Sequence, residues 1–528
     1  MTKLNYIKTI KIKIRGEKKM KNINKTKTGL FVLLFVCCIN FVCAELPKEE
    51  PLWTIGEDYL VVENGNPSLF FLFDNTEIYV DLKNDGVWEF YTVQNAGVQF
   101  TPSIAGQSIT YGDKVHTSKP VIYYRGGNRY DVVPPLGKWK SEYYAYGETW
   151  YAIVEENTTI YVDDNYDGTI DRNISAVPFT ANSVAVNNFG RVFSDKPFYF
   201  WTSDNTGAQK GTDFYLPWNG MWRILVLENN TEIKIDKNND GFYDGGTVTW
   251  NKGVVSDFTG LSFADGAHLR FSKPVVVFLI NCQYYCCSYY SLPSSSMLGN
   301  DFWSLWSGDD SWYQLTGFFN NATGIAANTT YYADKVIEND LISNYNGTLI
   351  SNQVTNTPVL GWIHIWGNMP FGCVYRYPYC YVYTIPQSSI TSTTYGTQKY
   401  LGANEITEIY VRVFNPFANT TISNVNITVK IPSNFSLPNG NNLTLNIKKL
   451  YLRNDTVIEN DTLVVTPTNT GSNYEFTITS VETSLLNSLD VMKYIDIRYQ
   501  VVTPSEYGQY KFEPVHVDYT AETWNMPQ

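Results

Sequence analysis

Apolar and polar side chains alternate in short runs along most of the chain. Between residues 51 and 385 these runs are rich in Val, Ile, Tyr, Phe, Trp and Thr, and Gly, Asn, Asp or Pro separates them at intervals of roughly eight to twelve residues. Alternation with a period of two is typical of β-strands that bury one face, and β-branched and aromatic residues favour the same structure. The pattern predicts an all-β protein, with one arguable helical stretch, SVETSLLNSLDVMK, near the C-terminus.

One strand-and-turn pattern recurs along the first two thirds of the chain. It occurs without insertion as NTEIYVDLKNDGVWE at 75–89, NTTIYVDDNYDGTID at 157–171 and NTEIKIDKNNDGFYD at 230–244. Each copy is followed by a second landmark, which reads SKPVIYYRG from Ser118, DKPFYFWTS from Asp195 and SKPVVVFLI from Ser272. A fainter fourth copy pairs NTTYYAD at 328–334 with NTPVLGWIHIW from Asn356. Such self-similarity indicates one supersecondary unit that buries its sheet against neighbouring copies of itself.

The repeat sets the expected domain organisation. Residues 51–385 are predicted to form a four-unit repeat β domain, arranged like a propeller or, alternatively, as a row of β-sandwiches. A closed ring hides its sheet edges and a row does not, which favours the propeller-like arrangement. The Ser/Thr-rich segment 386–399 is predicted to be a linker. Residues 400–528 alternate again and are predicted to form a second β domain.

Both predicted domains resemble known families. The recurring header with Leu-Pro and Gly, the T-x-I-x-V strand and the closing S-x-KP-V-x-V-F strand look like the N-terminal domain of IgG-Fc-binding proteins, over about 335 residues. That resemblance implies extracellular binding or adhesion, with no catalytic residues to transfer. The segment EITEIYVRVFNPFANTTISNVNITVKIPSNF looks like the immunoglobulin-like conserved-repeat modules of prokaryotic surface proteins. It implies an immunoglobulin-like β-sandwich that serves as a stalk or spacer.

The N-terminus is typical of a secretory signal peptide, predicted over residues 1–44. A region with five lysines precedes the apolar run from Gly29 to Ala44, and small residues end this run. The mature chain would begin at Glu45, and Met20 is a candidate for the true start. An uncleaved anchor is the alternative, although the run is short for a bilayer span of about 20 residues. The chain is therefore expected to be exported, extracellular or at the cell surface, without a membrane span of its own after signal removal.

The charge of the chain narrows the class of partner. The sequence contains 39 Lys and Arg and 51 Asp and Glu, a net charge of −12. Residues 1–44 hold ten of the basic and one of the acidic residues, which leaves 29 against 50, a net −21, for the mature chain. A strongly acidic chain without a basic cluster is a poor nucleic-acid binder. The expected partner is an extracellular protein or a glycan, and not a nucleic acid.

Two modifications common in exported proteins are also predicted. The Asn-x-Ser/Thr sequons make glycosylation candidates of Asn157, Asn173, Asn229, Asn321, Asn328, Asn346, Asn419, Asn426, Asn434, Asn442, Asn454 and Asn460. The alternative is an Asn/Thr-rich β-structure with chance matches. The cysteines after the signal are disulfide candidates with their pairing left open: Cys282, Cys286, Cys287, Cys373 and Cys380. Their spacing disfavours a zinc site.

The Asp-Gly turns of the repeat carry further oxygens, spaced as in the first half of an EF-hand loop. The expected calcium ligands of the second copy are Asp163, Asn165, Asp167, the Thr169 carbonyl and Asp171, and those of the third copy are Asp236, Asn238, Asp240, the Phe242 carbonyl and Asp244. Because Ile174 and Thr247 replace the bidentate Glu of an EF-hand, we expect a structural calcium of modest affinity. A plain hairpin turn is the alternative, and it is the expectation for the first copy, where Lys83 occupies a ligand position.

Enzyme signatures are lacking in the sequence. The four histidines are widely separated, and neither H-E-x-x-H nor G-x-S-x-G occurs. Asp309 and Asp310 are candidates for a glycosidase pair, but adjacent residues of a strand point to opposite faces. Tyrosine-rich segments from Gln283 and from Cys373 are candidates for a binding patch, with aromatic core packing as the alternative. The prediction is a non-catalytic binding or adhesion protein, with a self-assembling structural envelope component and a carbohydrate-active enzyme as alternatives.

Overall fold

The computed structural model describes residues 55 to 521 apart from internal gaps. These gaps are residues 64, 66, 126–131, 203–207, 209, 217–220, 238–242, 245–246, 256–266, 284–285, 292–298, 308–311, 317–318, 321–324, 327–328, 336–344, 350–353, 358–360, 378–380, 385–390, 397–402, 418–419, 453, 507–509 and 511. The described part consists of β-strands joined by turns and by two short 3-10 helices, η1 (Leu82–Asn84) and η4 (Ser484–Leu486). This confirms the all-β prediction. Within those residues no helix is long and apolar enough to cross a membrane. The predicted signal peptide and both candidate glycosidase carboxylates lie outside the described residues.

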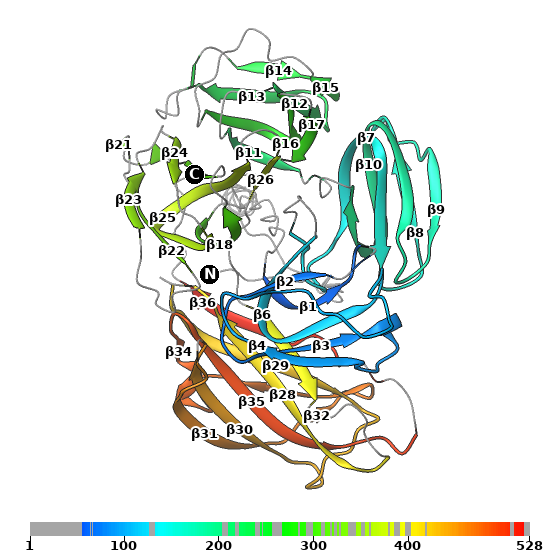
Figure 1. The fold of residues 1–528 in the computed structure, drawn as a ribbon, viewed down its shortest axis with the longest axis vertical. Helices are drawn as coiled ribbons and strands as arrows, with labels where there is room; N and C mark the ends of the chain where they lie inside the picture. The colour runs from blue at the N-terminus through cyan, green and yellow to red at the C-terminus, as the bar shows by residue number, and fades with distance from the viewer. Residues whose placement is uncertain are drawn as a thin grey trace, which may run out of the picture. The chain divides into compact units, whose positions relative to one another are not determined.

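The first repeat unit is one antiparallel sheet built around a long central strand, β6 (Figure 1). Its strands are β1 (Gly56–Leu60), β2 (Ser68–Phe71), β3 (Thr76–Asp81), β4 (Phe90–Gln94), β5 (Gln99–Phe100) and β6 (Lys114–Tyr124). They are ordered β4-β3-β6-β2-β5, and β1 also pairs with β6. The first half of β6 pairs with β3 and β1, and the second half pairs with β2.

The third and fourth units repeat this arrangement, with orders β14-β13-β16-β12-β15 and β23-β22-β25-β19-β24, and each adds one strand that pairs with its central strand. The third unit contains β11 (Gly211–Tyr215), β12 (Met221–Val226), β13 (Thr231–Asp236), β14 (Val248–Trp250), β15 (Gly253–Val255), β16 (His268–Gln283) and β17 (Cys286–Ser291). The fourth contains β18 (Gly299–Ser307), β19 (Trp312–Thr316), β22 (Thr329–Lys335), β23 (Tyr345–Leu349), β24 (Val354–Thr357), β25 (Gly361–Tyr377) and β26 (Tyr381–Thr384). A separate hairpin joins β20 (Phe319–Asn320) to β21 (Ile325–Ala326).

The second unit is the same sheet with some strands fused. It has the order β7-β10-β8-β9, with β7 (Lys140–Val154), β8 (Thr158–Asp163), β9 (Arg172–Ala176) and β10 (Asn182–Trp201). The long strand β7 takes the places of β1 and β2, because its two halves pair with different parts of β10. The faint fourth copy of the sequence repeat corresponds to the fourth unit, whose strand order matches those of the first and third units.

A proline marks the place where the central strand changes partners. The residues that follow Pro120, Pro274 and Pro370 each pair with the glycine that opens the first strand of their unit, and the register shifts there. Proline has no N–H to donate, so it is tolerated where the ladder is interrupted. This corrects the second landmark of the fourth copy, which the sequence placed at Asn356. That residue lies on β24 and pairs with β19, and Pro370 is the equivalent of the other two prolines.

The units bury one another's apolar faces. Leu225 and Phe278 of the third unit pack in one cluster with Tyr144 and Phe189 of the second. Tyr199 and Trp201 of the second unit likewise belong to the core cluster of the first. The third unit contacts the fourth through β17 and β26.

Among the described residues, the matching face of the first unit is covered by parts of the chain that follow it in the sequence. Its residues Phe70, Ile122 and Tyr124 cluster with Trp303 of the fourth unit and with apolar residues of the C-terminal domain. Trp303 packs edge-on against Phe73, with 5.7 Å between the ring centroids. Contacts between units thus return from the fourth to the first. This favours the propeller-like expectation over a row of sandwiches.

The C-terminal residues form two sheets around one core, in agreement with the predicted sandwich. One sheet has the order β27-β28-β35-β30-β31, and the other has β32-β33-β29-β34 with β36 also on β29. The strands are β27 (Thr391–Gly396), β28 (Ile406–Asn415), β29 (Ile422–Pro432), β30 (Leu443–Tyr451), β31 (Val457–Val465), β32 (Thr468–Asn469), β33 (Asn473–Ile478), β34 (Ser488–Leu489), β35 (Lys493–Val502) and β36 (His516–Ala521). Val411, Ile427, Ile447 and Ile497 are among the residues of the shared core.

Two expectations from the sequence do not match the structure of this domain. The predicted linker 386–399 contains β27, which pairs with β28 along its whole length, because threonines are as well suited to strands as to linkers. The arguable helix SVETSLLNSLDVMK holds only the single turn η4 and the short strand β34. Leu485 and Leu486 of that turn are buried in the core of the sandwich.

An acid–base pair recurs across the first and central strands of the units. Asp58 lies 3.1 Å from Lys114 in the first unit, Glu142 lies 3.0 Å from Arg191 in the second, and Asp301 lies 2.9 Å from His364 in the fourth. The last pair is the most enclosed, since both side chains are at most 1% exposed. Trp303 stacks on the imidazole of His364, with 3.7 Å between ring centroids.

We expect Asp301→Ala to lower the free energy of unfolding by about 3–5 kcal/mol, because it leaves His364 without this partner inside a closed core. Urea denaturation of the mature chain measures the loss. Lys430→Ala is the control, since it breaks the exposed Lys430–Glu513 pair and should cost no more than about 1 kcal/mol. Equal losses for the two variants would contradict the structural role of the buried pair.

Candidate functional site

The Asp-Gly loops are held by the same hydrogen bonds in more than one copy. In the first copy, the carboxylate of Asp81 accepts hydrogen bonds from the backbone N–H of Asp85 at 2.9 Å and of Gly86 at 2.8 Å. In the second copy, the carboxylate of Asp163 accepts from Asp167 at 3.0 Å and from Gly168 at 2.9 Å. The carboxylate that opens each of these two loops is therefore a structural brace.

The acidic residue that closes each loop has a matching role. The carboxylates of Glu89, Asp171 and Asp244 accept a backbone N–H from the residue after the opening aspartate, at 2.8, 2.7 and 2.6 Å. The backbone N–H groups of the same three residues donate to the carbonyl of the next-to-last residue of the preceding strand, at 2.9, 2.8 and 2.6 Å. This explains the carboxylates that a simple Asp-Gly hairpin turn does not require.

These bonds bear on the predicted calcium ligands without deciding their role. In the second copy Asn165 and Asp167 also accept backbone N–H groups, from Asp167 at 3.0 Å and from Thr169 at 2.7 Å. In the described part of the chain, no three His, Cys, Asp or Glu side chains are gathered closely enough to hold a metal ion. Asn238, Asp240 and Phe242 of the third copy lie outside the described residues. Calcium binding stays a prediction for both copies.

In the first and third units the two sequence landmarks meet in one place, which we call the lysine corner. In the first unit the hydroxyl of Ser118 accepts the N–H of Glu77 at 2.9 Å, and Lys119 Nζ donates to the Asp74 carbonyl at 2.6 Å. In the third unit Ser272 and Lys273 make the equivalent bonds, to the N–H of Glu232 at 2.8 Å and to the Asn229 carbonyl at 2.6 Å. The Asn-Thr and Ser-Lys-Pro motifs recur together because they bind each other.

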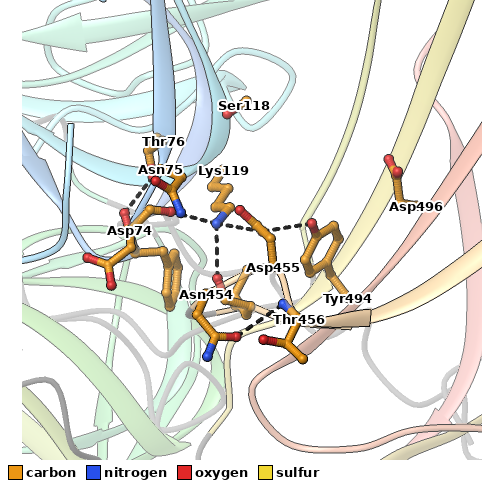
Figure 2. A network of polar contacts seen from close by, with 12 residues as sticks. Asp74, Asn75, Thr76, Ser118, Lys119, Asn454, Asp455, Thr456, Tyr494 and Asp496 are labelled. Carbon is orange, nitrogen blue, oxygen red and sulfur yellow. Dashed lines mark hydrogen bonds and ion pairs between the residues drawn. The ribbon is translucent and has the colours of Figure 1, made fainter. Parts of the chain in front are cut away.

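The lysine corner of the first unit is covered by the C-terminal domain. Figure 2 shows Lys119 pointing from the first sheet toward the turn that contains Asn454 and Asp455. Its ammonium group lies 2.8 Å from Asp455 Oδ1 and donates to the Leu452 carbonyl at 3.2 Å. The Tyr494 hydroxyl donates to the same carboxylate at 2.8 Å. Lys119 thus joins two segments more than 300 residues apart in the sequence.

A second cation crosses the same junction. Arg412 Nη1 donates to the Ser118 carbonyl at 3.0 Å, and Arg412 Nε lies 3.0 Å from the buried carboxylate of Asp496. Asp496 also pairs with Arg498 at 2.7 Å. Apolar residues of both domains surround these polar contacts, as the cluster that includes Phe414 and Tyr494 shows. The junction combines an apolar core with charge-assisted hydrogen bonds, which are among the stronger polar contacts in proteins.

Burial sets the electrostatics of the junction. The Lys119 side chain is only 1% exposed, and desolvation lowers the pKa of its ammonium group while Asp455 opposes that change. Burial also raises the pKa of the Tyr494 hydroxyl above its usual range. The lysines at the same corner of the second and third units, Lys196 and Lys273, are 46% and 36% exposed. Only in the first of these three units does the lysine lie within an interface.

The structure describes the position of most predicted disulfide and glycosylation sites, and the rest lie outside the described residues. The backbone register sets Cys282 opposite Cys287 on β16 and β17, but the side chains of the tyrosine- and cysteine-rich segments are not part of the described structure. Among the glycosylation candidates whose exposure is described, Asn426 is half-buried and the others are exposed: Asn157, Asn173, Asn229, Asn346, Asn434, Asn442, Asn454 and Asn460. Asn321, Asn328, Asn419 and Cys380 lie outside the described residues.

Two features of the structure are not evident from the sequence pattern. Ser-Lys-Pro is a landmark of the repeat, yet nothing in the pattern distinguishes Lys119 from the lysines of the other copies. The second feature is an aromatic group on the first unit, where Tyr79 lies 5.1 Å from Tyr91 and 5.6 Å from Trp88 between ring centroids. Tyr79 and Tyr91 stand opposite each other on β3 and β4, and a tyrosine on each arm of a predicted hairpin is the signal that could have identified this group.

Comparisons with known proteins give little to add to this geometry. No family model matches the sequence, and no curated protein matches it. Among solved structures, the N-terminal domain of the Streptococcus gordonii adhesin Sgo0707 has a TM-score of 0.20 and 10% identity, over 89% of this chain and 93% of that one. Salmonella alpha-2-macroglobulin reacted with methylamine has a TM-score of 0.09 and 8% identity, over 89% of this chain and 36% of that one. Likenesses this weak carry no functional argument, so the two family resemblances stay predictions.

We expect Lys119→Met to lower the free energy of unfolding by about 2 kcal/mol or more, because two carbonyl groups and the Asp455 carboxylate lose a charged donor. Lys273→Met removes the equivalent lysine from an exposed corner and should cost less than about 1 kcal/mol. Urea denaturation gives both values, and hydrogen exchange of residues 449–456 reports the junction itself. Equal losses, with unchanged exchange, would show that Lys119 does not hold the domains together.

The opening aspartate of the first loop should make stability depend on pH. Burial raises the pKa of Asp81 from 3.8 to about 6, although the two backbone N–H groups oppose the rise. The folded chain then binds a proton that the unfolded chain releases, so this contribution is present below pH 4 and is lost as the pH rises through about 6. Relative to Asp81→Asn, the wild-type chain should lose thermal stability between pH 4 and pH 7 in a chelating buffer. A constant difference across that range would contradict the assignment.

Proposed function

We propose that this chain is a non-catalytic binding or adhesion protein that acts outside the cell. The observation that carries the proposal is that one β unit recurs four times and that neighbouring units bury one another's apolar faces. A repeated scaffold presents related surfaces side by side, and linked binding surfaces gain strength without new contacts. The exposed sequons and the predicted signal peptide support an exported, glycosylated chain.

The junction between the first unit and the C-terminal domain supports an adhesion protein whose two domains keep a fixed orientation. A stalk that only spaces a binding domain from the cell needs no more than a linker, whereas here Lys119 and Arg412 tie the sandwich to the first unit. Buried polar contacts of this kind fix one orientation, because any other orientation would leave their partners unpaired. We infer that the repeat domain and the C-terminal domain act as one rigid body under load.

Calcium bracing is the second part of the proposal. The loop of the second copy offers the carboxylates of Asp163, Asp167 and Asp171, and the sequence of the third copy has aspartate at the same positions. Carboxylate oxygens are the ligands that calcium prefers. Each carboxylate oxygen has a second lone pair beyond the one that accepts a backbone N–H. A bound calcium ion would therefore add to a loop that is already formed.

A capture experiment tests the proposed function. The mature chain, residues 45–528, is incubated with cell-envelope and glycan preparations in calcium and again in chelator. We expect specific capture that the chelator weakens, and the double variant Asp167→Ala with Asp240→Ala should show the same loss in calcium. Glu459→Ala with Asp518→Ala removes two carboxylates outside the loops and should leave capture unchanged.

The outcomes separate the parts of the proposal. Capture that does not respond to chelator would retain adhesion and reject the calcium brace. If envelope and glycan preparations retained nothing above background, the adhesion proposal would be wrong.

A further inference from the structure

The outer edge of the first unit is formed by β4. This strand ends its sheet and pairs only with β3 among the described strands, so one side of its backbone faces away from the sheet. Its sequence, FYTVQ, contains no charged residue and no proline. Natural proteins usually block such an edge with charges, proline or a bulge, because an open edge can pair with another strand.

The corresponding strands of other units are blocked in ways that β4 is not. β9 begins with Arg172 and contains the predicted glycosylation site Asn173, which is exposed. β23 contains the predicted site Asn346, also exposed, and β14 has only three residues. Charge, a bulky glycan or short length would each hinder strand pairing at those edges. The open edge of β4 is therefore a feature of the first unit and not of the repeat as such.

Two apolar side chains stand exposed on one face of β4. Tyr91 and Val93 are 55% and 44% exposed, and they are two residues apart on the same side of the strand. The ring of Tyr91 is held in place by Tyr79, at 5.1 Å, and by its hydroxyl, which lies 3.3 Å from Glu77 Oε1. The nearest carboxylate on this face thus lies on β3, one strand inward from the edge.

We propose that two copies of this chain pair through β4, antiparallel, around a two-fold axis at Thr92. This register sets Thr92 opposite its own symmetry mate and Tyr91 opposite Val93 of the other copy, twice. Aromatic and β-branched residues in directly opposed positions stabilise a strand pair. The interface is isologous, since the same patch serves on both subunits.

The net charge opposes this pairing at long range, but the seam itself is uncharged. The mature chain has a net charge of −21, so two copies repel each other, whereas β4 carries no charged side chain. Two five-residue strands bury less than the roughly 1,000 Å² that a stable interface needs, so the dimer is weak in dilute solution. Chains held together on one surface would have a high effective concentration, and weak pairing would then suffice.

Cysteine cross-linking tests the register directly. Thr92→Cys places one thiol on the two-fold axis, where paired strands bring the two Cα atoms within the range that a disulfide spans. We expect mild oxidation of the mature chain to give a covalent dimer, with a peptide linked through residue 92 identified by mass spectrometry. Val93→Cys lies opposite Tyr91 of the other copy and should cross-link far less. Ser175→Cys on β9 is the matched control on a blocked edge.

Sedimentation of the wild-type chain completes the test. A dimer that forms with rising concentration, is promoted by salt and is lost in Val93→Glu would support the proposal. A monomer at all concentrations would overturn it, and so would equal cross-linking at residues 92, 93 and 175. The result is independent of the capture experiment, because pairing through β4 requires no external ligand.

Discussion

The structure depends on the need to cover both faces of each repeat sheet. In the first three units, the part of the central strand that follows the proline carries apolar residues on both faces. One face forms the unit's own core, and the other face must be buried by a neighbour. The second and third units use the preceding unit for this purpose. In the described part of the chain, the corresponding face of the first unit is buried by Trp303 and by the C-terminal domain. A sandwich that would otherwise be a separate module thereby becomes part of the packing of the repeat.

This constraint explains why a lysine can lie at the centre of an interface. Burying an ammonium group is costly unless it is paired and hydrogen-bonded. Lys119 meets both conditions, because Asp74 and Leu452 supply carbonyl oxygens and Asp455 supplies a carboxylate. The first of these bonds belongs to the repeat unit itself, as Lys273 shows, so docking of the second domain adds acceptors to a donor that is already oriented. Tyr494 and Arg412 then extend the network into the sandwich.

Local patterns predicted much of the fold, and long-range contacts marked the limit of prediction. The alternation of apolar and polar residues predicted the all-β class, and the recurring Asn-Thr strand predicted the repeat. Both patterns can be recognised within a few consecutive residues. The register of the fourth unit was not, because Asn356 and Pro370 each precede a run of strand-forming residues and only pairing with β18 or β19 distinguishes them. The partners of Lys119 lie more than 300 residues away, and those of His364 lie 63 residues away. No spacing rule connects such positions.

The conformation of the Asp-Gly loops does not depend on whether their residues could bind calcium. In the first copy Lys83 occupies a position where calcium would need an oxygen, yet Asp81 and Glu89 make the same backbone contacts as Asp163 and Asp171 do in the second copy. The loop conformation of these two copies is therefore set by hydrogen bonds that do not depend on the residue at the position of Lys83. A cation bound by the second copy would bind to a hairpin that is already folded. It would change the charge of the surface more than the stability of the sheet.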